Sequence, residues 1–379
     1  MWFPLLPAWL HRGTCPRNLT IDRQFPGNQS VGYVGTRAIH IVQLQEGNPT
    51  TIPGYVNGRP YHCHPADNPT GPPTLDDQCS TTAGFPPKSN PTYGIVNQNT
   101  AASETWYNAL QMKWTKRFSH GLSGGITYTW AKMLDYGSGQ QGVEAAAGEA
   151  VLFPQVRFLD KGIGGFSIAS NFKANVMYRV PALINYQGRI ANALNGWWIA
   201  GIVSMQSGLP LNPIIGNRSL SNNPAAAGTA NDRPNLDPSF NRATVITHNP
   251  SNWFNETMFG VPLAGTLGNE PRNFLRGPDL KNVDFAINKD TKADFLGEQG
   301  IVQFRTEFFN ILNRPNFANP NATIASFSSP AAIQCGPNYT VTSCRFGSSS
   351  ALGINSTAGQ ITSTVTTSRQ IQLSLKLIF

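Results

Sequence analysis

The chain has 379 residues, of which 40% are hydrophobic but only 13% are charged, about half the charged share of a typical soluble domain. Its 36 Gly and 29 Pro favour β structure with long turns, and the sequence holds no apolar run of the ~18 residues that a transmembrane helix needs. The net charge of +8 comes from Lys and Arg residues scattered singly along the chain, which argues against nucleic acid as a partner.

The first ten residues are apolar but do not resemble a secretion signal, because they lack a basic segment and contain Pro4 and Pro7. After them, apolar and polar residues alternate in short segments, as in half-buried strands. The sequence predicts about nine such strands, at 18–25, 29–44, 106–117, 122–130, 171–180, 196–207, 281–289, 301–309 and 369–379. In the second strand the alternation slips around Gly35, Thr36 and Arg37, where we expect a bulge.

The predicted connections alternate between short and long. Tight turns or brief connectors follow every other strand, and irregular stretches rich in Pro, Gly, Asn and Thr separate the resulting pairs. These stretches, predicted as long loops, are 45–104, 134–168, 208–279 and 310–367. Short turns on one side and long loops on the other are typical of bacterial outer-membrane barrels, whose long loops are extracellular.

The last strand shows the same two faces most clearly and ends the chain on an aromatic residue. Ile371, Leu373, Leu375, Leu377 and Phe379 share one face, and Gln370, Gln372, Ser374 and Lys376 share the other. About ten residues are enough to cross a bilayer at a tilt of ~45°. A strand of a soluble sandwich alternates in the same way, so the order of connections is what favours a membrane barrel with its apolar face toward lipid.

Other side chains gain expected positions from this arrangement. We expect cations to line the polar, lumenal face: Lys113, Arg117, Lys173, Arg179 and Lys376. They are suited to anionic solutes, although a water-filled interior needs polar residues for any substrate. The tryptophans near strand ends are expected to form the interfacial girdles of a barrel rather than carbohydrate platforms: Trp106, Trp114, Trp130, Trp197 and Trp198.

No catalytic, cofactor or metal site is predicted, and the chain is not expected to be an enzyme. His62, Cys63 and His64 are adjacent on a loop and so point in different directions, which disfavours a shared metal. Asp284 and Glu307 are expected to form structural pairs with Arg305. A phosphate cradle at Gly162, Gly164 and Gly165 is disfavoured because these glycines do not join a strand to a helix.

Five cysteines allow several pairings. Cys63 with Cys79, and Cys335 with Cys344, lie within two predicted external loops, where an oxidising environment favours disulfides; Cys15 is then left over. Other pairings among the five remain open.

Several segments, taken together and in order, resemble the barrel part of Oar-like TonB-dependent receptors. They are Tyr33 to Arg37, Tyr107 to Gln111, Lys116 to Phe118, Tyr128 to Lys132, Gln206 to Pro210, Arg272 to Pro278, Phe304 to Phe317 and Gly359 to Thr362. The resemblance implies an outer-membrane β-barrel related to nutrient uptake receptors. It also implies that barrel-assembly machinery recognises the terminal strand ending in Phe379.

The chain departs from that family in size. Such receptors have about 22 strands around a plug domain, so residues 1–379 are expected to be a C-terminal part, an incomplete antiparallel barrel without plug and N-terminal strands. The TonB system is then a partner only if the missing N-terminal part is present. Two alternatives to solute uptake are a surface interaction or adhesion protein and a decayed receptor remnant. A soluble carbohydrate-active β protein is disfavoured, since no paired carboxylates converge in the pattern.

Overall fold

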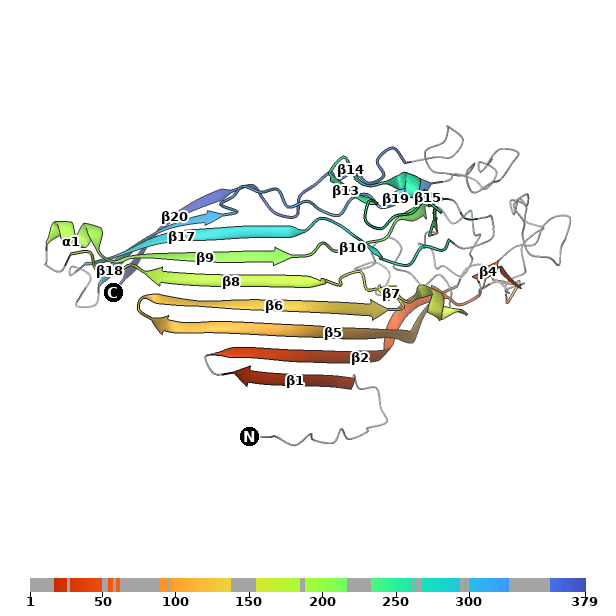
Figure 1. The fold of residues 1–379 in the computed structure, drawn as a ribbon, viewed down its shortest axis with the longest axis horizontal. Helices are drawn as coiled ribbons and strands as arrows, with labels where there is room; N and C mark the ends of the chain where they lie inside the picture. The colour runs from red at the N-terminus through yellow and green to blue at the C-terminus, as the bar shows by residue number, and fades with distance from the viewer. Residues whose placement is uncertain are drawn as a thin grey trace.

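The computed structural model describes residues 17–25, 28–49, 54–56, 59–61, 89–93, 96–137, 155–184, 188–216, 233–260, 262, 268–293, 297, 300–326 and 355–379. In this part of the chain, nine long strands form one antiparallel sheet in the order of the sequence (Figure 1). They are β1 (Arg17–Phe25), β2 (Gln29–Glu46), β5 (Asn97–Ser119), β6 (Leu122–Asp135), β8 (Ser170–Arg179), β9 (Trp197–Gln206), β17 (Leu280–Lys292), β18 (Ile301–Phe309) and β20 (Gln370–Ile378). The two-residue β7 (Gly162–Ile163) adds to the end of β6. The predicted all-β fold with nine strands is confirmed.

Within the part of the chain that the structure describes, the sheet does not close on itself. Each strand from β2 to β18 pairs with a neighbour on both sides, whereas β1 and β20 are the two ends of the strand order. The expectation of an incomplete barrel is therefore confirmed.

The strand register carries one apolar face across the sheet. Side chains of directly opposed residues share a face, and one such row runs Val31, Met112, Tyr128, Phe172, Met205 from β2 to β9. At the other edge, β20 continues the pattern by pairing Ile371, Leu375 and Leu377 with Phe308, Phe304 and Val302. The predicted alternation thus gives a continuous apolar face and a continuous polar face.

The two ends of the sheet differ, as the connection lengths predict. The short connections, helix α1 (Arg189–Leu194) and the C-terminus lie at one end, and the long connections lie at the other (Figure 1). In the turn between β5 and β6, His120 and Gly121 have φ of 52° and 77°. Only glycine fits the second position, because a Cβ there would lie 2.5 Å from the carbonyl oxygen of Arg179.

Two details of the predicted strands are wrong: the position of a bulge in β2 and the first residue of β5. The register of β2 with β5 is regular through Gly35 to Arg37 and shifts instead between Ala38 and Val42, where His40 has a φ of 60°. β5 begins at Asn97, about nine residues before the predicted strand, and Glu46 is paired with Asn97. Polar residues hid this extension, because a strand that continues beyond the apolar zone no longer needs to alternate.

The predicted long loops also contain structure. The 208–279 stretch holds β10 (Pro210–Leu211), β11 (Ile214–Gly216), β12 (Asn235–Leu236), β13 (Ile246–Asn249), β14 (Asn252–Phe254), β15 (Phe259–Gly260), β16 (Leu275–Arg276) and the 3-10 helix η3 (Glu256–Met258). Other loops hold β3 (Gly54–Val56), β4 (Arg59–Tyr61), η2 (Arg157–Asp160) and β19 (Thr323–Ser326). β19 pairs in parallel with β11, so two long connections are joined.

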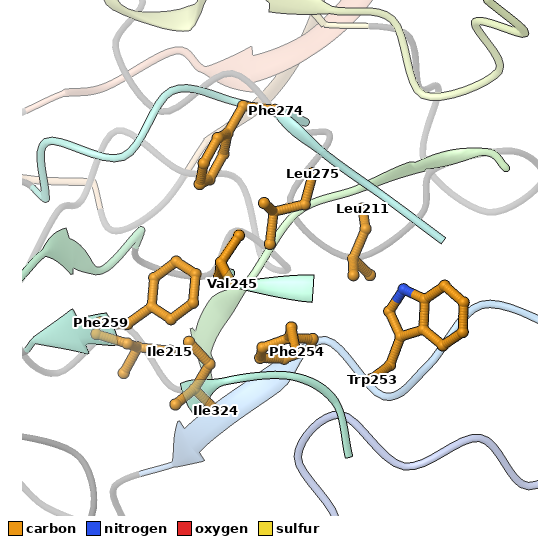
Figure 2. Close-up of a cluster of buried hydrophobic side chains, with 9 residues drawn as sticks. All are labelled: Leu211, Ile215, Val245, Trp253, Phe254, Phe259, Phe274, Leu275 and Ile324. Atoms are coloured by element: carbon orange, nitrogen blue, oxygen red, sulfur yellow. The ribbon is translucent and has the colours of Figure 1, made fainter. Parts of the chain in front are cut away.

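A hydrophobic cluster lies among these short strands, and we call it the loop-end core (Figure 2). Its members are Leu211, Ile215, Val245, Trp253, Phe254, Phe259, Phe274, Leu275 and Ile324. Phe259 packs edge-on against Phe254, with ring centroids 6.0 Å apart. The strands are too short to show a period, which explains why the sequence pattern predicts only loops here.

The loop-end core yields a first prediction. Phe254 is fully buried, so Phe254→Ala is expected to destabilise the loop end by ~3–5 kcal/mol through lost burial and a cavity. Phe158→Ala is the matched control, since that ring is 65% exposed. Proteolysis of vesicle-inserted protein within residues 208–279 measures the effect. Equal cleavage rates for the two variants would contradict a cooperative core.

Candidate functional site

The polar face of the sheet carries the predicted cations. Lys113 and Lys173 both lie opposite Thr127, and Lys376 lies opposite Gln303. Arg179 lies opposite Trp198 and approaches Asp290 at 3.5 Å. Lys113, Lys173, Arg179 and Lys376 are exposed, so this face can contact water and polar solutes. Arg117 follows the point where the β5–β6 register becomes irregular.

Carboxylates on this face serve the structure. Glu307 accepts a hydrogen bond from Arg305 at 2.8 Å, and Arg305 also donates to Asn288 at 3.0 Å. The predicted Glu307 pair is thus present. Asp284 differs from the expectation: its Oδ1 accepts from the backbone N–H of Asn310 and from the Asn282 amide, at 2.9 and 2.8 Å. Asp284 binds Asn310 because it lies on β17 beside the end of β18, where Asn310 begins the next turn.

A buried group of charged residues lies at the loop end, and we call it the loop-end ion cluster: Asp135, Asp160, Arg233, Glu270 and Arg272. Arg233 pairs with Asp160 at 2.9 Å. Arg272 pairs with the Asp135 carboxylate and donates to the carbonyl oxygens of Asp135 and Asp160 at 2.9 and 3.0 Å. Since Asp135 ends β6, Asp160 lies in η2 and both arginines belong to the 208–279 stretch, the cluster joins two long connections.

Glu270 is the exception within this cluster. Its side chain is buried, and its two carboxylate oxygens accept no hydrogen bond from the described residues. Burial raises the pKa of Glu270 well above its usual range, and the nearby charge of Arg233 offsets only part of that rise. The protonated form is therefore favoured relative to an exposed glutamate.

The segment from Arg272 to Pro278 fastens the loop end to the sheet. Asn273 has a φ of 58° and donates its side-chain amide to the Ile163 carbonyl oxygen at 2.8 Å. Its backbone N–H donates to Asn212 Oδ1 at 3.1 Å. Arg276 donates to the carbonyl oxygens of Ser167 and Gly208. Burial lowers the pKa of Arg276 from its usual value. These contacts hold the segment against the 134–168 stretch and against the start of the 208–279 stretch.

The tryptophans divide between the two faces. By register, Trp106, Trp114, Trp130 and Trp197 lie on the apolar face, with Trp130 62% exposed. Trp106 and Trp130 lie toward the long-loop end, and Trp114 and Trp197 toward the short-turn end, as two interfacial girdles require. Trp198 is wrongly assigned to a girdle, because it lies opposite Asn288 on the polar face.

Some predicted positions lie outside the described residues: His62, Cys63, His64, Cys15, Cys79, Cys335 and Cys344. Among the residues that are described, no group of three His, Cys, Asp or Glu side chains is placed to hold a metal. Gly162 and Gly164 are described and have a packing role. A Cβ on Gly162 would lie 2.7 Å from Arg272 Cβ, and one on Gly164 would lie 2.6 Å from Met133 Cε.

The sequence pattern did not predict the loop-end ion cluster. Its members are separated by up to 137 positions, so no local spacing indicates that they meet. The sequence did contain one signal. Asp135 ends an apolar strand and Arg272 precedes an Asn-Phe-Leu-Arg-Gly-Pro run, and burying a charge at either place is costly unless the fold pairs it.

None of the helices in the described part of the chain is long and apolar enough to cross a membrane. The meandering sheet, with one apolar face, one polar face and long connections at a single end, defines a β-barrel protein of the bacterial outer membrane. A family model described as an outer membrane beta barrel domain matches residues 16–372, and the chain belongs to that family. It is therefore a protein of the cell outer membrane, with the apolar face toward lipid and the long connections outside. No curated protein and no solved structure matches it.

The buried pairs give a second prediction. Asp135→Ala removes the Asp135 carboxylate from the buried Arg272 guanidinium, which is expected to cost ~3–5 kcal/mol. Glu104→Ala is the matched control, because it also breaks one arginine pair, but the exposed Arg37–Glu104 pair is worth only ~0–1 kcal/mol. Urea unfolding of the vesicle-inserted protein compares them. Equal midpoints would contradict a stabilising role for the cluster.

A third prediction concerns pH. Because the folded pKa of Glu270 is raised above its unfolded value, the folded state binds the proton more tightly. The contribution of Glu270 to the stability of the loop end is thus expected to be greatest below the ordinary glutamate pKa and to be lost as pH rises through the raised folded pKa. Glu270→Gln removes this loss and stabilises the loop end at neutral pH. Protease resistance of residues 208–279 across pH measures it; an unchanged pH profile in Glu270→Gln would exclude Glu270 as the cause.

Proposed function

We propose that this chain is the C-terminal wall of an Oar-like TonB-dependent receptor, which takes up a solute across the outer membrane. The observation that carries the proposal concerns Arg272 to Pro278, a segment in which the chain resembles those receptors. This segment fastens the external connections over the long-loop end of the sheet through Arg272, Asn273 and Arg276. External loops held in this way above a polar, cation-bearing wall suit the first contact with a solute.

The second long resembling segment, Phe304 to Phe317, supports the same proposal. Its Arg305 and Glu307 form a pair on the polar face. Beyond the strand, the Asn310 amide donates to the carbonyl oxygens of Arg314 and Thr367, at 3.0 and 3.1 Å. The start and the end of the connection between β18 and β20 are thereby joined at the end of the wall.

The open edges agree with a larger barrel. In a bilayer no water is present to satisfy the unpaired backbone groups of an edge strand, so β1 and β20 need neighbouring strands. The ~22 strands of such receptors would supply these neighbours. In this proposal a plug fills the lumen, the TonB system energises uptake through the N-terminal part, and barrel-assembly machinery binds the β20 end at Phe379, which is 92% exposed.

One observation favours a second candidate, a surface interaction protein. The loop-end core gives the external connections a packed interior of their own, which a solute pathway alone does not require. A folded external surface of this kind suits adhesion or surface organisation, and a receptor remnant could retain it after uptake is lost. Neither candidate involves catalysis by Asp284 or Glu307, because both carboxylates are held in structural hydrogen bonds.

A fourth prediction separates the two candidates. The complete reading frame is expected to encode a plug and a TonB-contacting segment upstream of residue 1. Spent medium is then compared among the parent strain, a gene deletion and a variant lacking only the TonB-contacting segment. Uptake predicts a solute that the parent depletes and that both mutants leave behind. An absent plug, or unchanged medium together with lost surface attachment in the deletion strain, would reject uptake in favour of adhesion.

A further inference from the structure

A hollow of about 290 Å³ lies on the apolar face, near the short-turn end of the sheet. Five strands contribute to it: β5, β6, β8, β9 and β17, whose central members are neighbours in Figure 1. Its walls are apolar side chains such as Trp114, Val176 and Phe285. Because this face meets the bilayer, the hollow opens toward lipid.

The strand register explains why the face is hollow at this place. One row across the sheet runs Gly124, Val176, Gly201, Phe285, and the row beside it includes Ala174. The rows on either side carry larger side chains: Tyr128, Phe172 and Met205 toward the loops, and Leu122, Tyr178 and Ile199 toward the turns. The small residues therefore form a depression that larger neighbours surround.

Among the described residues, the hollow is lined by one cation, the half-buried Lys116. It lies three residues before the end of β5, and its ammonium donates to Ser119 Oγ at 3.1 Å. This position is the periplasmic edge of the apolar zone, where a lysine reaches toward lipid headgroups. The hollow thus combines an apolar interior with a positive charge at headgroup level.

We infer that the hollow holds a phospholipid of the periplasmic leaflet, with an acyl chain against Gly201 and an anionic headgroup beside Lys116. Lipid tails are as apolar as this face, so the hydrophobic effect gives no preference for the site. Selectivity must come from close packing in the hollow and from the charge of Lys116. A second copy of this chain is a poorer occupant, since a two-fold contact would bring another Lys116 to the same place. The inference does not depend on solute uptake.

Two pairs of variants separate the effect of the shape of the hollow from the effect of the Lys116 charge. Gly201→Leu fills the hollow without backbone strain, because a Cβ there meets only Val176 Cγ1 at 3.6 Å and Asp284 O at 3.8 Å. Thr306→Leu is its control, being a similar enlargement on the apolar face of β18, outside the hollow. Lys116→Gln removes the charge. Lys113→Gln is its control, because it removes a charge from the same strand on the polar face.

The experiment places the full chain in nanodiscs of equal phosphatidylethanolamine and phosphatidylglycerol, then releases it gently for native mass spectrometry. We expect a retained lipid in which phosphatidylglycerol is enriched about fivefold, the factor corresponding to ~1 kcal/mol for one lysine near an anionic lipid. Lys116→Gln should abolish the enrichment, and Gly201→Leu should remove the retained lipid itself. Both control variants should behave as the parent chain does.

Four results would overturn the inference. One is retained lipid at the bulk ratio in the parent chain. Another is unchanged retention in Gly201→Leu, with insertion of that variant verified by protease protection of its strands. The third is cross-linked dimers through β6, β8 and β9 in place of retained lipid, which would assign the hollow to a second copy. A parent chain that does not insert would also reject it, since the hollow would then never meet a bilayer.

Discussion

Backbone hydrogen bonding within the sheet is the constraint on which the rest of the structure depends. In a bilayer each unpaired N–H or C=O costs several kcal/mol, so a chain that crosses with strands must pair them continuously. The strands from β2 to β18 meet this requirement on both sides through one antiparallel meander. Because the pleat alternates with a period of two, the same pairing assigns each side chain to lipid or to the polar face. The girdle tryptophans, the cations of the wall and the lipid-facing hollow all follow from that register.

Outside the bilayer, the structure depends on the burial of side chains. The long connections are held by burial, in the loop-end core and in the loop-end ion cluster. Buried ion pairs are weak evidence for stability, but they tolerate the loss of neither partner, so they favour one arrangement of the loops. Arg272 illustrates this role, since it binds the end of β6 and the η2 turn at once. A fixed arrangement of external loops is useful both to a receptor and to a surface interaction protein, which is why genetics rather than geometry must separate them.

The two edges connect the fold with its proposed setting. β20 presents one side to β18, and its other side carries no partner strand in the described part of the chain. Its apolar face is nevertheless aligned with the lipid-facing rows of the whole sheet. An edge of this kind is prone to pair with another strand. The wall is thus suited to continue into further strands.

The sequence by itself determined the strands, their faces and the direction of the connections. This was possible because the pleat of a strand has a period of two and the bilayer requires one face to be apolar, and residues such as Ile371 to Phe379 show that pattern locally. Only the tertiary structure decided the rest. It moved the bulge to His40, extended β5 back to Asn97, turned Trp198 to the polar face and gathered Asp135, Asp160, Arg233 and Arg272 into one cluster. These features depend on contacts between residues far apart in the chain, where hydrogen bonding and burial replace any repeating pattern that a sequence can show.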